Sequence, residues 1–89
     1  MLALTLLLRP AMSIYLSAPA IARLSACSRI AAHVAMRHGR YGPLLQRGRV
    51  PYADLAEVER NTGRQFTPEQ IAMAVDGRPD RLITIDVED

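Results

Sequence analysis

The chain has 89 residues, enough for one small domain that buries about 60 % of its unfolded surface. Its eleven basic residues are all arginines, which either an arginine-favouring codon bias or a requirement for phosphate binding explains. Cys27 is the single cysteine, so the sequence excludes an internal disulfide and a zinc cluster of the C-x-x-C type. Cys27, His33 and His38 lack a fourth Cys or His ligand, and we predict no metal and no cofactor.

The charge is distributed unevenly along the chain. Residues 1–53 contain seven arginines and no acidic residue, whereas residues 54–89 contain four arginines and nine acidic residues. The two parts carry formal charges of +7 and −5, which give the net charge of +2. A basic surface attracts nucleic acid or an anionic membrane, and an acidic surface repels both. We therefore expect any polyanion to bind on the side of residues 37–49.

Residues 1–33 differ from the rest in composition, and we assign them to a basic extension that is helical or disordered. They are rich in Leu, Ala, Ser and Arg and contain no acidic residue. The apolar run Leu2–Leu8 is too short to cross a bilayer and has no positive charge before it, unlike a secretory signal. The composition fits an organellar transit peptide. A helix over 20–37 would be basic and amphipathic, a character typical of targeting helices and of helices that bind membrane surfaces. Alternatively, the true coding start lies elsewhere or the chain is a fragment of a longer protein.

The middle of the chain predicts strands. Apolar residues alternate over 30–37, which favours a strand, although the same residues also fit the helix over 20–37. A turn at residues 38–39 then leads into a second strand over 41–47. A third strand is predicted over 50–55, with Pro51 tolerated at an edge or a strand start.

The last third of the chain predicts a helix and a final strand. Residues 56–65 are polar and indicate a loop or one helical turn. Thr67 and Gln70 have the spacing of a capping box, so a helix is expected to begin there. Apolar residues alternate again over 83–87, which indicates a strand. The predicted fold class is α+β, a small antiparallel β-sheet with one packed helix, in a domain of residues 34–89.

Residues 39–48 have the sequence GRYGPLLQRG, in which two glycines and a proline surround one tyrosine. This segment resembles the C-terminal repeat of bacterial type IA DNA topoisomerases (topoisomerase I), whose pattern is roughly G-R-Tyr/Phe-G-P-Tyr. In that family an Ala-Ser-Leu and a Thr-Leu-Glu follow before an apolar helix. The corresponding residues here are Gly39–Gln46, Ala53–Leu55 and Phe66–Gln70, so the resemblance covers about residues 34–76. The chain departs from the family at Leu44, where a second aromatic is usual, and at Asp54, which replaces a serine.

The resemblance implies a non-catalytic accessory module that binds single-stranded DNA without sequence specificity, beside a topoisomerase catalytic domain. The predicted DNA-binding residues are Arg40, Tyr41, Gly42, Pro43, Arg47 and Arg49. The tyrosine would stack on an unpaired base, the arginines would contact phosphates, and the Gly-Pro backbone would let a nucleotide approach. No catalytic residue is predicted, because the strand-cleaving tyrosine of the family lies in a separate domain.

Other interpretations of the same residues stay open. Tyr41 fits a core position equally well, and the three arginines fit solvated charges at a sheet edge. For the function, one alternative is a protein interaction module or an orphan or fragment product with no nucleic-acid role. A second alternative is a small membrane-associated protein anchored by its N-terminus. The expected location is the cytoplasm, at the nucleoid, or an organelle if residues 1–33 are a transit peptide.

Overall fold

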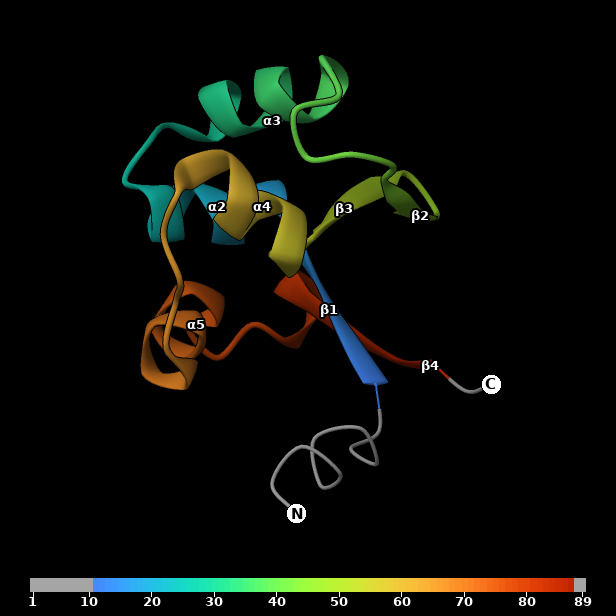
Figure 1. Cartoon of the computed structure of the whole chain (residues 1–89), viewed down its shortest axis with the longest axis vertical. Coiled ribbons are helices and arrows are strands. Elements are labelled where there is room, and N and C mark those ends of the chain that lie inside the picture. The colour runs from blue at the N-terminus through green and yellow to red at the C-terminus, as the bar shows by residue number, and fades with distance from the viewer. Residues whose placement is uncertain (1–10, 88–89) are drawn as a thin grey trace.

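The computed structural model describes residues 11–87 of the chain and has an α+β fold (Figure 1). The predictions for residues 1–10 lie outside this range. The elements in chain order are β1 (Ala11–Ser17), α2 (Ala18–Ser25), α3 (Arg29–Arg37), β2 (Leu45–Arg47), β3 (Val50–Asp54), α4 (Leu55–Thr62), α5 (Pro68–Val75), the 3-10 turn η1 (Pro79–Arg81) and β4 (Leu82–Val87). The predicted α+β class with an antiparallel sheet is confirmed, but the described part has four α-helices rather than one.

The sheet has four strands in the order β2-β3-β1-β4, and every neighbouring pair is antiparallel. β1 lies in the interior of the sheet, where Leu16 is opposite Ala53 of β3 and Leu82 of β4. Residues 11–33, which the sequence analysis set apart as an extension, form β1, α2 and the start of α3. They therefore supply an interior strand and share one hydrophobic core with the residues that follow.

The core lies where the sheet meets α2. Leu16, Ile21 and Val58 are its largest fully buried side chains and come from β1, α2 and α4. α2 packs against both α3 and α5, and these three helices lie one below another in Figure 1. Ser17 ends β1 and Pro19 lies in the first turn of α2, a position where the missing proline N–H costs no helical hydrogen bond.

The predicted strand over 30–37 is wrong, because these residues form α3. Ser28 caps this helix, and its side-chain oxygen accepts a hydrogen bond of 3.0 Å from the Ala31 N–H. Ala32, Ala35 and Met36 are buried on one face of the helix. Their three- and four-residue spacing is that of a helix face. In this alanine-rich segment the apolar residues also alternate, so the sequence pattern favours a strand over a helix.

The predictions for the C-terminal half agree better with the structure. Thr67 begins α5 with a complete capping box, in which the Gln70 N–H donates to Thr67 Oγ1 and the Thr67 N–H donates to Gln70 Oε1. The final strand is β4. The predicted loop or single turn over 56–65 is wrong, because Leu55–Thr62 form the eight-residue helix α4, whose first turn is capped by Asp54. The second predicted strand is shorter than expected, since β2 begins at Leu45. No helix within residues 11–87 combines the length and apolar character needed to cross a bilayer.

Candidate nucleic-acid interface

Tyr41 belongs to the hydrophobic core. It is 4 % exposed and lies in the turn that follows α3. Burial raises the pKa of the Tyr41 phenol, nearby Cys27 adds to the increase, and Arg40 opposes it. A base cannot stack on a ring that other side chains already cover. The sequence allows Tyr41 to be either an exposed stacking ring or a core residue, and in the structure it is a core residue.

Gly42 is covered by an acidic side chain. Its φ is +69°, and a Cβ at this position would lie 3.3 Å from both Cγ and Cδ of Glu57. The Glu57 carboxylate in turn accepts two hydrogen bonds of 3.0 Å from Arg60 Nη1. Gly42 is thus required by the turn and by the approach of α4. Because the Glu57 side chain already lies against Gly42, the predicted close approach of a nucleotide to the Gly42 backbone is disfavoured, whereas Pro43 is exposed.

The three arginines of the predicted site lie at different elements. All three are exposed: Arg40 follows α3, Arg47 ends β2, and Arg49 lies in the turn before β3. Arg49 lines a hollow together with residues from other parts of the chain. Arg49 therefore belongs to a basic surface whose other residues lie outside the GRYGP segment.

This basic surface consists of two adjoining hollows, which we call the arginine groove. Their volumes are about 340 Å³ and 380 Å³. Pro19, Arg29, Arg78 and Arg81 line both hollows, so the two lie side by side. Its basic residues are Arg23, Arg29, Arg49, Arg78 and Arg81, with His33 beside them.

A hydrogen bond between distant segments brings the two sides of the groove together. The Tyr52 hydroxyl in β3 donates to the backbone carbonyl of Asp80 in η1. Since Arg78 and Arg81 flank Asp80 and Arg49 is close to Tyr52 in the chain, this bond holds arginines from two segments near each other. Arg81 is fixed further, because its Nη1 donates to the Ala74 carbonyl at 3.1 Å.

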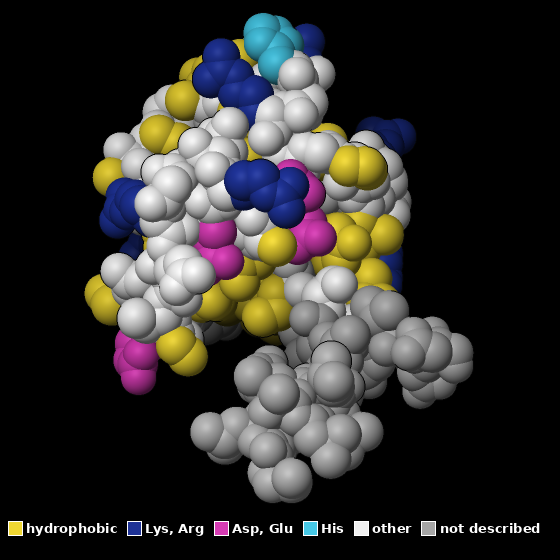
Figure 2. Space-filling view, in the orientation of Figure 1, with side chains coloured by type: hydrophobic (Ala, Val, Ile, Leu, Met, Phe, Trp, Pro, Cys, Tyr) yellow, Lys and Arg dark blue, Asp and Glu magenta, His cyan; other side chains and the backbone are white. Residues whose placement is uncertain are grey.

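The positive charge of the groove is largely uncompensated. In the part of the chain that the structure describes, the sole ion pair is Arg60–Glu57, which lies outside the groove. Asp80 is the one acidic residue among the groove's lining residues. Near the centre of the face shown in Figure 2, a basic side chain lies beside acidic side chains. A concave surface with five arginines and one carboxylate has a positive potential, which attracts anions.

Ser17 lines the smaller of the two hollows together with Arg49 and is 3 % exposed. Its Oγ is buried and has no hydrogen-bond partner among the described residues. Buried hydroxyls without a partner are uncommon, because leaving one unsatisfied costs about 1–3 kcal/mol.

Sequence reasoning missed four of the five groove arginines. Arg23 and Arg29 fell in the supposed extension, and Arg78 and Arg81 fell in the acidic part of the chain. The helix predicted over 20–37 would carry Arg23 and Arg29 on one face, but nothing in the spacing brings them together with Arg78 and Arg81. Within residues 11–87, no group of three or more His, Cys, Asp or Glu is placed to hold a metal ion.

Comparison of the chain with protein-family models, with curated proteins and with solved structures finds no match. The resemblance of residues 34–76 to the topoisomerase repeat consequently stays a prediction. The function must be argued from the groove itself.

Proposed function

We propose that this protein is a non-catalytic module that binds the phosphate backbone of single-stranded DNA through the arginine groove. The observation that carries the proposal is the convergence of five arginines around Pro19 without an ion-pair partner among the described residues. Guanidinium groups bind phosphate oxygens through paired N–H donors, and these charge-assisted hydrogen bonds are among the strong ones.

The extent of the groove favours a polymer over a single small anion. Its arginines come from α2, α3, the turn before β3 and the η1 region. One phosphate group is satisfied by two or three such side chains, whereas a strand offers a phosphate at each nucleotide. The choice of single-stranded DNA, and a role beside a topoisomerase catalytic domain, come from the sequence resemblance.

Binding of this kind should be modest in affinity and sensitive to salt. Each phosphate contact on a single strand contributes about −0.7 to the slope of log K against log salt. If all five groove arginines contact phosphates, the slope is about −3.5. Since backbone contacts carry no sequence information, different DNA sequences should bind similarly.

The test is a fluorescence anisotropy titration of labelled oligothymidylate with the full chain at two salt concentrations. The double variant Arg29→Gln/Arg78→Gln removes two groove arginines, and Arg40→Gln/Arg47→Gln removes two exposed arginines outside it. Both change the net charge equally. The groove variant should reduce the salt slope by about 1.4 and the control should reduce it far less. An equal reduction of the salt slope in the two double variants, or no binding by the folded protein at low salt, would overturn the proposal.

A further inference from the structure

A third hollow, of about 290 Å³, lies between α2 and α5 and differs in chemistry from the arginine groove. Arg23, Leu24, Gln70, Met73 and Ala74 line it. Met73 is 70 % exposed, which is unusual for a large apolar side chain in the middle of a helix. We call this site the Met73 hollow. Its volume is near the lower limit of sites for small ligands, which is about 300 Å³.

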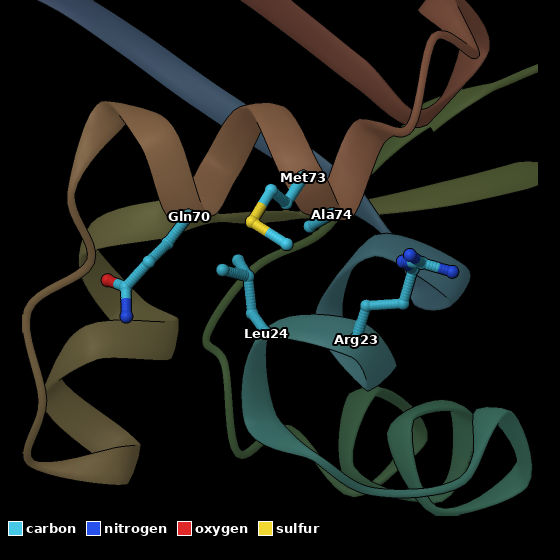
Figure 3. A pocket seen from close by; sticks show the side chains of 5 residues that line it. All are labelled: Arg23, Leu24, Gln70, Met73 and Ala74. Atoms are coloured by element: carbon cyan, nitrogen blue, oxygen red, sulfur yellow. The ribbon is translucent and has the colours of Figure 1, made fainter.

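The side chains around the Met73 hollow form an apolar floor with a polar group at each end. In Figure 3, Met73 and Ala74 of α5 face Leu24 of α2, with Gln70 on one side and Arg23 on the other. Gln70 Oε1 accepts the capping hydrogen bond from the Thr67 N–H at 2.9 Å, so its amide is held in place. The Nε2 donors of Gln70 have no acceptor in the part of the chain that the structure describes.

The Met73 hollow adjoins the arginine groove at Arg23. Arg23 lines both, because it belongs to the hollow with Leu24 and to the groove with Arg29 and Arg78. A strand whose phosphates lie along the groove would therefore pass Arg23 next to the apolar floor. The unpaired bases of such a strand expose apolar faces and polar edges, which match the floor and the donors at its ends.

We propose that the Met73 hollow receives an unpaired base of the strand whose phosphates occupy the arginine groove. The base lies on Met73, since a thioether makes favourable contacts with an aromatic ring. The Arg23 guanidinium lies beside or over the ring and also reaches the adjacent phosphate. Gln70 Nε2 donates to a carbonyl oxygen or ring nitrogen at the base edge. This inference rests on the proposed function and gives it the stacking site that the buried Tyr41 does not provide.

The experiment compares two labelled strands of equal length and charge, oligothymidylate and the corresponding abasic strand. Anisotropy titrations use the full chain, Met73→Ala and the control Ile30→Ala. Ile30 is 76 % exposed on α3, so both variants remove an exposed apolar side chain from a helix without disturbing the core. Alanine also favours helix, and α3 and α5 should therefore stay folded.

The unmodified protein should bind oligothymidylate about two- to tenfold more tightly than the abasic strand, the range expected for contact of a thioether with one ring. Met73→Ala should lower this ratio and leave the abasic affinity unchanged, while Ile30→Ala keeps the ratio. A ratio of one in the unmodified protein, or a ratio that Met73→Ala does not alter, would overturn the base site and leave the phosphate groove standing. Failure of both strands to bind would overturn both proposals.

Discussion

Replacing Gly42 by alanine tests whether the GRYGP segment is built around its contact with α4. Gly42 has a φ of +69°, and a Cβ there would lie 3.3 Å from Glu57 Cγ and Cδ. Gly39 is a matched control within the same turn, because its φ is +75° and a Cβ there would meet nothing within 4 Å. Gly39→Ala therefore introduces backbone strain alone, whereas Gly42→Ala introduces strain and a side-chain contact.

The two variants should differ by the free energy of that contact. A side chain in the left-handed region costs about 1–2 kcal/mol at either position. The gain from a less flexible unfolded chain is the same for both and cancels in the comparison. At Gly42, Glu57 must also shift by a few tenths of an ångström, against the two hydrogen bonds it accepts from Arg60. We expect an additional cost of about 1 kcal/mol, the lower end for overpacking, because Glu57 is only half-buried.

Urea unfolding, or thermal unfolding followed by circular dichroism, measures the difference. In a domain of this size 1 kcal/mol corresponds to about 4–8 °C in Tm, with Gly42→Ala lower than Gly39→Ala. Repeating the Gly42→Ala measurement in a Glu57→Ala background should remove the gap, since the contact is gone. Equal stability of the two glycine variants, or a gap that persists without Glu57, would refute the assignment of Gly42 to the α4 contact.

Three further predictions concern the core and the helix cap. Tyr41→Ala should lower the free energy of unfolding by about 3–5 kcal/mol in a denaturant titration, as for other large buried aromatics. Tyr41→Phe should keep both the fold and the DNA affinity. A Tyr41→Ala protein as stable as the unmodified one would contradict the core position. Because the folded pKa of Tyr41 is raised, its contribution to stability is complete below about pH 10 and is lost as the pH rises through the folded pKa. Urea midpoints should therefore fall at high pH, and by less in Tyr41→Phe; equal decreases would contradict this. Thr67→Ala breaks the capping box of α5 and should cost about 1 kcal/mol of unfolding free energy, with no change expected if the cap contributes nothing.

Local sequence signals were sufficient for the elements that depend on local physics. The Thr67 and Gln70 pair predicted α5 because both partners of the capping box lie within one helical turn. The alternation over 83–87 predicted β4, since valine and isoleucine favour strands. Residues 30–37 gave the wrong element, because small alanines occur on both faces of the segment and the periodicity does not distinguish strand from helix.

The candidate site depended on tertiary packing and could not be predicted from spacing. Tyr41 and the glycines beside it have the same sequence pattern whether the ring is exposed or, as here, 4 % exposed. The arginine groove forms only when β1 and α2 join the sheet and η1 is held against β3 by the Tyr52 hydroxyl. Arg29 and Arg78 are far apart in the sequence, and the charge asymmetry along the chain placed one of them in the acidic part.

The most direct test of the arginine groove is an NMR titration of the isotope-labelled full chain with unlabelled oligothymidylate at low salt. Backbone amides and arginine side-chain N–H groups report which surface the strand contacts. We predict the largest shift changes at Arg23, Arg29, Arg49, Arg78 and Arg81, with smaller changes near Arg40 and Arg47. Shift changes confined to residues 39–47, or no changes at all in a well-folded spectrum, would contradict the assignment of binding to the groove.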